Sequence, residues 1–212
     1  MHQLTFPLSP DDIRGLRVGD PVRLTGVMLT GRDAAHKWMI DTFIKKGRPP
    51  AGDDLEVERA IRPLLAGGAI YHCGPVVGGL DTKDYRFVAA GPTTSIREEP
   101  YQGDVMRHFQ VRAVIGKGGM GPKTLAACGE VPGVYLHAIG GAATLIAQTV
   151  TRVLGVHKLD FGVPEAMWVI EVKDFPAVVT MDSHGVSLHA EIEARSAERL
   201  AQLVGAPSGL AP

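Results

Sequence analysis

Two apolar segments, each followed by a glycine-rich corner and a helical stretch, constrain most strongly how this chain can fold. Residues 111–116 (VRAVIG) and 134–139 (VYLHAI) have the composition of buried strands. We expect helices after them, over residues 122–129 and 142–154. The order strand, helix, strand, helix predicts a parallel sheet with right-handed crossovers.

The flanking segments add antiparallel strands to this unit. We expect strands over residues 2–7, 21–30, 69–77, 85–90, 166–172 and 177–182, the last two joined through residues 173–176 (KDFP). Helices are expected over residues 32–46, ended by Gly47, and over residues 55–65, with a short capped turn at residues 9–12. The prediction is one α/β domain spanning residues 1–212 with mixed parallel and antiparallel sheets. It includes an exposed loop near residues 47–54 and a C-terminal helix near residues 190–204.

Composition narrows the class of protein. The chain has 212 residues, with 22 Lys and Arg against 23 Asp and Glu, so its net charge of -1 argues against nucleic acid or an anionic membrane as a partner. It has no long apolar run and no secretory leader pattern, so we expect no membrane span and a cytoplasmic location. Two cysteines, Cys73 and Cys128, cannot make a four-cysteine zinc site, and we expect both as reduced thiols.

Arg32 lies where the strand over residues 21–30 gives way to a helix. Loops at the carboxyl ends of strands are where open α/β sheets build their sites. A cation at a helix N-terminus opposes the macrodipole, so helix stability does not explain Arg32. The alternatives are a ligand-binding role and a pairing with Asp33 or another surface carboxylate. His36, beside the apolar face of this helix, is interpreted as a packed histidine rather than a ligand.

A second strand end carries GPTTSIR at residues 91–97. Ser95 with Glu98 matches a capping box, but Pro100 would then clash inside the helix. The alternative is a helix that begins nearer Glu99-Pro100. That would leave Thr93 to Arg97 as a loop whose hydroxyl and N–H groups face outward, which suits an anion.

A third strand end carries Lys117 in the glycine-rich run GKGGMGPKT at residues 116–124. The run fails the Walker pattern, because its lysine does not follow the last glycine of the motif, and it lacks the acidic residue of a dinucleotide fingerprint. Its glycines are interpreted either as turn residues or as flexible backbone around a functional lysine.

The three strand ends each offer one cation, namely Arg32, Arg97 and Lys117. If the strands are neighbours, these cations converge around Thr93 and Thr94 and form a pocket for a small dicarboxylate, because arginine holds planar carboxylates in bidentate fashion. The pocket lacks a general base, since a threonine hydroxyl needs a neighbour that accepts its proton.

The ordered motifs resemble the C-terminal (beta) part of iron-sulfur class I hydro-lyases, the family of class I fumarate hydratases and L(+)-tartrate dehydratases. The resemblance runs over nearly the whole chain, from LRVGD to about His189. The motifs that carry it are TGRDAAHK (30–37), HCGPVV (72–77), GPTTSIR (91–97), IGKGGMGPKT (115–124), AIGGAA (138–143) and PEAMW…IEVKDFPAVV (164–179).

The resemblance implies a fold, a reaction and a partner. The fold is the swivelling β/β/α domain, and the reaction is reversible addition of water to a dicarboxylic acid. A [4Fe-4S] cluster is expected in a separate alpha subunit, with no cluster or other metal bound by this chain alone. The family expectation is an α2β2 assembly.

The resemblance also implies roles for individual residues. Thr93 is expected to be the catalytic base, helped by an aspartate of the alpha subunit. Arg32 and Arg97 are expected to hold substrate carboxylates, and Lys117 to complete the cationic pocket. Departures from the family are the longer segment at residues 48–68, Ile96, and residues 98–101 (EEPY).

Three classes of function follow, the first with two candidate substrates. The favoured one is the beta subunit of a fumarate hydratase, because GRDAAH and AIGG resemble fumarases more closely than tartrate dehydratases. An L(+)-tartrate dehydratase beta subunit is the alternative within the family. Outside the family, the alternatives are a free-standing small-anion-binding domain and a nucleotide-binding protein read from GKGGMG.

Overall fold

The computed structural model describes residues 1–45 and 49–204. Its strands are β1 (His2–Thr5), β2 (Pro21–Thr30), β3 (Ala69–Tyr71), β4 (Val76–Gly78), β5 (Arg86–Ala89), β6 (Ala113–Gly116), β7 (Val134–His137), β8 (Val150–His157) and β9 (Met167–Met181). Its helices are α1 (Pro10–Arg14), α2 (Asp33–Met39), the π-helix η1 (Ile40–Ile44), α3 (Asp53–Leu65), the 3-10 turn η2 (Ser95–Glu98), α4 (Glu99–Phe109), α5 (Pro122–Glu130), α6 (Ala143–Ala147), the 3-10 turn η3 (Leu159–Phe161) and α7 (Leu188–Val204).

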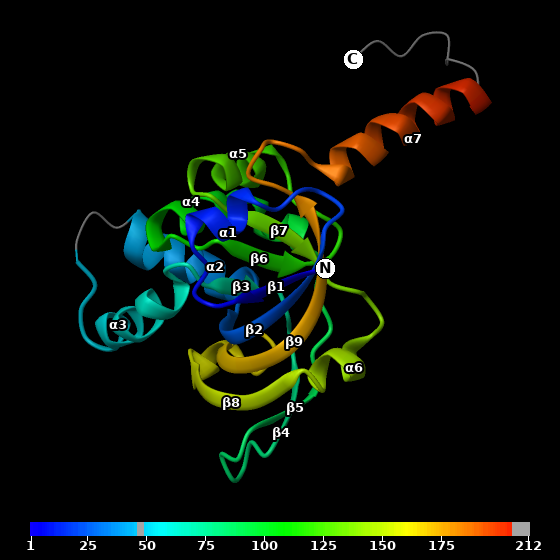
Figure 1. Cartoon of the computed structure of the whole chain (residues 1–212). Helices are drawn as coiled ribbons and strands as arrows, with labels where there is room; N and C mark the ends of the chain where they lie inside the picture. Colours follow the sequence, from blue (N-terminus) through cyan, green and yellow to red (C-terminus); the bar gives the residue numbers. More distant parts are fainter. Residues whose placement is uncertain (46–48, 205–212) are drawn as a thin grey trace.

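The main sheet closes on itself. Its strand order is β1-β2-β3-β6-β7-β9-β8, and an additional antiparallel pairing joins β2 to β9. β2, β3, β6 and β7 run parallel, whereas β9 is antiparallel to its neighbours β2, β7 and β8. The α/β fold with mixed strand pairings is therefore confirmed, and β4 and β5 form a separate hairpin below the barrel (Figure 1).

Alternating residues of the strands pack into two cores. Leu136 and Ile115 lie in a cluster inside the closed sheet with Trp168, and all three are fully buried. Val114 and Tyr135, next to them in sequence, lie in a second cluster against the helices on the outer face. This period of two is what a strand buried on both faces requires.

Three sequence predictions about elements are wrong. The helix expected over residues 142–154 is only α6, and the chain then becomes β8, whose β-branched residues pair with β9. The strand expected over residues 69–77 is broken after Tyr71 and resumes as β4, because Gly74-Pro75 interrupts it. The two strands expected around residues 173–176 are one strand, β9, because β2 pairs with both halves of it.

The N-terminal helices also differ in detail from the prediction. The helix expected over residues 32–46 starts at Asp33 and changes into the π-helix η1, and its expected end at Gly47 lies outside the described residues. In the expected loop near residues 47–54, residues 47 and 48 likewise lie outside the described residues, and α3 already begins at Asp53. The Ser9 cap of α1 is confirmed, because Ser9 and Asp12 form a reciprocal capping box.

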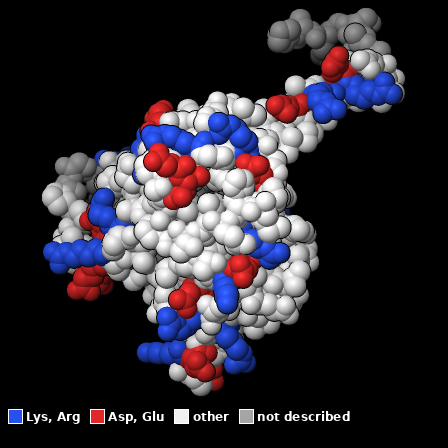
Figure 2. Space-filling model, viewed as in Figure 1, with Lys and Arg blue, Asp and Glu red and all other residues white. Residues whose placement is uncertain are grey.

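α7 confirms the predicted C-terminal helix and projects away from the barrel (Figures 1 and 2). Lys and Arg are interspersed with Asp and Glu on the face shown in Figure 2, with no continuous basic surface there. Within the described ranges 1–45 and 49–204, no helix is long and apolar enough to cross a membrane.

Candidate functional site

The carboxyl ends of β2, β3 and β6 form one level edge. Thr30 pairs with Tyr71, and Tyr71 pairs with Ile115. Arg32 and Lys117 follow the two outer strands of this trio. Because neighbouring strands lie about 4.8 Å apart, the backbones that carry these two cations leave the sheet roughly 10 Å from each other.

A loop between β5 and α4 crosses this edge and brings Thr93 to it. The Thr93 N–H donates to the His72 carbonyl at 2.7 Å, and the Lys117 N–H donates to the Thr93 carbonyl at 3.2 Å. The Ser95 N–H then donates to the Lys117 carbonyl at 3.0 Å. The three cation-bearing strands are therefore not neighbours, contrary to the prediction: β2 and β6 belong to one sheet but are separated by β3, and β5 lies in the separate hairpin and supplies only the loop.

The start of α4 decides between the two interpretations of this loop. Ser95 opens the 3-10 turn η2, and α4 begins at Glu99 with Pro100 in its first turn. The Ser95 hydroxyl is buried against His72, so it makes no capping box with Glu98. The later helix start is confirmed, but the expectation that the hydroxyl and N–H groups of this loop face outward is wrong for Thr93 and Ser95, because these groups bond inward to His72 and Lys117.

Arg32 is held on two sides. Its Nη2 lies 3.2 Å from Glu165 Oε1, and the other oxygen of Glu165 accepts the Ala34 N–H at 3.2 Å. A Cβ added to Gly74 would lie 2.4 Å from Arg32 Nη1, so the guanidinium occupies the space that this glycine leaves open. The Arg32 Nε–H is buried without a hydrogen-bond partner, and its donor is therefore uncommitted.

The other predicted cations are less enclosed. Arg97 Nη2 lies 3.2 Å from Asp33 Oδ2, and about half of the Arg97 side chain is exposed. Asp33 thus pairs with Arg97, whereas Arg32 pairs with the carboxylate of Glu165, which comes from a distant segment of the chain. The half-buried Lys117 has its stem over Gly140, where an added Cβ would lie 3.5 Å from Lys117 Cδ.

Sequence reasoning missed His72 as a member of this region. His36 is fully buried, as predicted for a packed histidine, and it shares Gln102 as a partner with His72, also fully buried. The sequence did contain a signal for His72: it follows a buried strand that lies, along the chain, between the strands preceding Arg32 and Arg97. Burial lowers the pKa of His36 and lowers that of His72 to about 3, with the nearby His36 ring adding to the shift.

Glu98 is a buried acid next to these residues. Its side chain is fully buried, and both of its carboxyl oxygens lack a hydrogen-bond partner. Burial, and secondly the charge of Asp33, raise its pKa to about 8. Glu98 is therefore largely protonated near neutral pH.

The glycine-rich run after β6 is a turn. Gly118 and Gly119 both have φ of 81°, a left-handed conformation that favours glycine. The helix that follows has its N-terminus already filled, because Glu99 accepts the N–H groups of Gly121, Lys123 and Thr124 at 2.8 to 3.3 Å. A phosphate would need this position, so the arrangement counts against the nucleotide interpretation.

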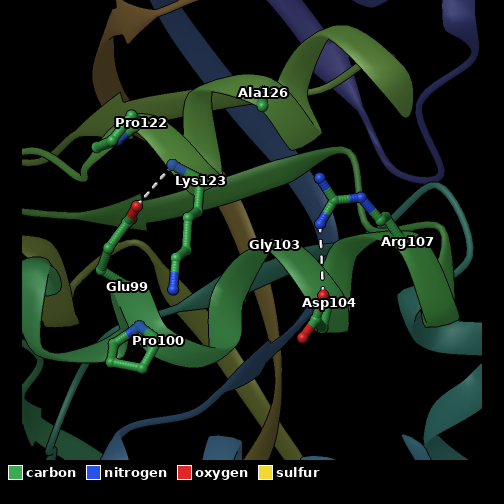
Figure 3. Close-up of a pocket in the computed structure, with 8 residues that line it drawn as sticks. All are labelled: Glu99, Pro100, Gly103, Asp104, Arg107, Pro122, Lys123 and Ala126. Carbon is green, nitrogen blue, oxygen red and sulfur yellow. Dashed lines mark hydrogen bonds and ion pairs between the residues drawn. The ribbon is translucent and has the colours of Figure 1, made fainter.

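A cavity between α4 and α5 contains none of the predicted site residues. It is lined by Glu99, Pro100, Gly103, Asp104, Arg107, Pro122, Lys123 and Ala126 (Figure 3). Glu99 points across it to the first turn of α5, and the Asp104–Arg107 pair lies at the other end (Figure 3). We interpret the cavity as a groove between two packed helices.

The residues present do not fit an iron-sulfur cluster. Cys73 lies in the core inside the barrel and Cys128 in the core under the helices, and burial raises the pKa of each thiol to about 12. Both are free cysteines. In the described part of the chain, no three His, Cys, Asp or Glu side chains are grouped to hold a metal ion.

Comparison with known proteins places this chain in a family. Residues 3–192 match the family model "Fumarase C-terminus". The chain is 53% identical over 199 residues to a Geobacillus stearothermophilus protein named "Putative fumarate hydratase class I", covering 94% of this chain but only 35% of that relative. It therefore spans about a third of that protein's length.

Two shorter relatives match almost from end to end. The L(+)-tartrate dehydratase subunit beta of Escherichia coli K12 is 37% identical over 197 residues, which are 92% of this chain and 90% of the relative. A Methanocaldococcus jannaschii protein named "Putative L(+)-tartrate dehydratase subunit beta" is 36% identical, over 93% of this chain and 96% of its own.

Proposed function

Because the chain belongs to the fumarase C-terminus family, we propose that it is the beta subunit of a two-subunit hydro-lyase that reversibly hydrates fumarate to L-malate. In this proposal the chain supplies the cations that bind the substrate carboxylates and a threonine that moves a proton. A separate alpha subunit completes the active site. The enzyme is active only as the assembly, in the cytoplasm.

The uncommitted Nε–H of Arg32 is the observation that carries the proposal. A buried donor without a partner costs about 1–3 kcal/mol, which a bound carboxylate would offset. The partially exposed Arg97 and the half-buried Lys117 lie on segments that meet at the same edge. Three cations suit a ligand with two carboxylates, and charge-assisted bonds from arginine would fix its orientation.

Thr93 is the proposed base, and its contacts show what it needs from a partner. Its Oγ1 donates to the His72 carbonyl at 3.0 Å, so the oxygen lone pairs face away from that bond. A carbonyl cannot take up the hydroxyl proton, so Thr93 requires a carboxylate that can accept it. We propose that an aspartate of the alpha subunit has this role.

The alpha subunit is also the proposed location of the [4Fe-4S] cluster, because the described residues of this chain do not fit one. When bound there, the cluster would supply a Lewis acid for the substrate hydroxyl. Residues of this chain would bind the carboxylates, orient the substrate and hold the proton at Thr93 Oγ1. An α2β2 assembly is proposed for the whole enzyme.

Two relatives support different substrates. The higher identity, 53%, is to a protein named as a class I fumarate hydratase, which favours fumarate. L(+)-Tartrate is the second candidate, favoured by the end-to-end match in length to the Escherichia coli subunit beta. Anaerobic co-purification of the tagged chain, with parallel assays of fumarate hydration and L-tartrate dehydration and an iron determination, separates them. A chain that elutes alone, free of iron and inactive, would point instead to a free-standing anion-binding domain.

The site assignment is tested by Thr93→Ala and Arg97→Ala in the assembled enzyme. Loss of the base is expected to lower kcat by about 10²–10⁴-fold, and loss of Arg97 to raise KM for the dicarboxylate. The exposed Thr5, on β1 and outside the candidate site, provides the matched control Thr5→Ala, which should keep wild-type turnover. Size-exclusion chromatography should show intact assembly for all three, and normal activity in Thr93→Ala would overturn the assignment of the base.

A further inference from the structure

A chain of buried polar side chains runs beneath the candidate site. Gln102 Oε1 lies 2.8 Å from His36 Nε2 and 2.8 Å from His72 Nε2. His72 Nδ1 lies 2.8 Å from Ser95 Oγ, which also accepts the Tyr135 hydroxyl at 2.9 Å. His36, His72, Gln102, Ser95 and Tyr135 are all fully buried. We call these five residues the buried polar chain.

Both histidines of the buried polar chain contact segments of the site. His36 Nδ1 lies 2.9 Å from the Arg32 carbonyl, which also accepts the backbone N–H of His36 at 2.9 Å. Arg32 caps α2 without a side-chain hydrogen bond, and the His36 ring adds a second hydrogen bond to the carbonyl of its extended backbone. The carbonyl of His72 accepts both the N–H and the hydroxyl of Thr93.

Donor and acceptor counting assigns the hydrogens. The Arg32 carbonyl can only accept, so His36 Nδ1 must carry a hydrogen, and a neutral His36 must then accept at Nε2. Gln102 must therefore present its NH₂ group to the two rings. Rotating the amide by 180° leaves its shape unchanged, and it gives each hydrogen of the Gln102 NH₂ group one imidazole acceptor. The amide oxygen then takes the buried position in which the nitrogen had no partner.

The same assignment determines the state of His72. Its Nε2 accepts from Gln102, so its hydrogen is on Nδ1 and is donated to Ser95 Oγ. The fit is tight, because a Cβ added to Gly116 would lie 1.9 Å from Ser95 Oγ and 3.2 Å from His72 Nδ1. Burial lowers the pKa of both imidazoles, which agrees with two neutral rings. Of the surrounding charges, Asp33 raises the pKa of His36 and Arg97 lowers that of His72, both secondary to burial.

We propose that His36 and His72, both neutral and protonated at Nδ1, are joined by the NH₂ group of Gln102 into a positioning device that holds the Arg32 backbone and the Thr93 loop in register. None of the three residues touches the substrate. The expected effect of these three residues on catalysis rests on the proposed function, whereas the assigned positions of the hydrogens on the two rings do not. Gln102 is the centre of the device, because its amide lies 2.8 Å from a nitrogen of each ring.

The hydrogens are tested by ¹⁵N NMR of the full chain labelled at histidine. Two of the eight histidines are expected to show a protonated Nδ1 and a bare Nε2, unchanged between pH 5 and 8. Gln102→Met should shift these two signals and so assign them. A hydrogen on Nε2 of either ring, or titration of either ring in this range, would overturn the assignment.

The positioning role is tested by Gln102→Glu in the enzyme assembled with its alpha subunit. A carboxylate can only accept hydrogen bonds, so one of the two rings must take up a proton to donate to it. We expect kcat to fall about 10–100-fold and its pH profile to show a new ionisation between pH 5 and 8. The exposed Gln3 provides the matched control Gln3→Glu, which makes the same charge change far from the site. A structural role alone would lower the amount of folded enzyme, measured by circular dichroism, without adding an ionisation to the pH profile of kcat.

The outcomes separate the two proposals. Wild-type kcat and pH profile in Gln102→Glu would overturn the positioning role. A wild-type assembly without hydro-lyase activity would overturn the proposed function, and the NMR measurement would then decide the inference about the hydrogens by itself.

Discussion

Glu98 shows at the scale of one residue how burial and charge act on the same group. The carboxyl is enclosed without a partner, and Asp33 adds a negative charge to its surroundings. Both effects penalise the ionised form more than Arg97 stabilises it, so the acid remains neutral. The chain therefore keeps a proton on an acid beside an arginine of the candidate site.

The stability of the protein should depend on pH through Glu98. Burial raises its pKa from the ordinary value of 4.5 to about 8, so between these values the unfolded state releases a proton that the folded state retains. The contribution of Glu98 to the free energy of unfolding then falls as pH rises, by about 2–3 kcal/mol between pH 5 and 7, whereas His36 and His72, whose pKa values burial lowers, contribute in the opposite sense. Glu98→Gln should remove only the contribution of Glu98, so the free energy of unfolding of the variant relative to wild type should rise by that amount over this range, as measured by urea unfolding at several pH values. An identical slope in the variant would mean that Glu98 ionises normally in the fold.

At the scale of elements, α4 and α5 are joined by one carboxylate. Glu99 opens α4 and also accepts the N–H groups at the N-terminus of α5, with a further bond of 2.6 Å from the Thr124 hydroxyl. A negative charge at this position satisfies unpaired donors and complements the macrodipole. The same carboxylate therefore fixes the turn after Lys117 relative to the loop that carries Thr93.

Removal of this cap should destabilise the protein without unfolding it. Glu99→Ala leaves three donors of α5 without their acceptor, and we expect a loss of about 1–2 kcal/mol in the free energy of unfolding. Glu130→Ala is the matched control, because Glu130 pairs with Arg107 at the exposed end of the same helix and should cost about 0.5 kcal/mol or less. Equal losses in the two variants would contradict the capping role.

At the scale of the whole molecule, stability resides in the closed sheet and its helix layer. Leu136 is fully buried inside the barrel, whereas Leu200, on the projecting helix α7, is 59% exposed. No residue of α7 is buried. The body of the protein should therefore unfold as a unit that is largely independent of α7.

A pair of leucine substitutions tests this division. Leu136→Ala opens a cavity in the barrel and is expected to cost about 2–5 kcal/mol. Leu200→Ala makes the same chemical change on an exposed face and should stay within about 0.5 kcal/mol. Thermal and urea unfolding of the purified chain measure both, and a large loss in Leu200→Ala would show that α7 packs on the body in solution.

Local signals in the sequence were sufficient for several elements. β2 has the predicted bounds, because alternation over ten residues is a signal that needs no distant partner. The Ser9 cap, α5 and α7 were likewise found from local patterns. β8 was missed because a short helix leads directly into a strand, and only pairing with β9 decides where the helix ends.

For the candidate site too, the sequence indicated some features and the tertiary structure decided the others. The sequence by itself determined which residue types are available at the strand ends, namely Arg32, Arg97, Lys117 and Thr93, because strand ends and glycine corners are local features. Only the tertiary structure decided their partners. Glu165 reaches Arg32 from across the fold, and Gln102 comes from α4 to join two histidines on different elements. Such contacts depend on the closure of the sheet and the packing of α4 against it, and no local pattern encodes a distance between segments far apart in the chain.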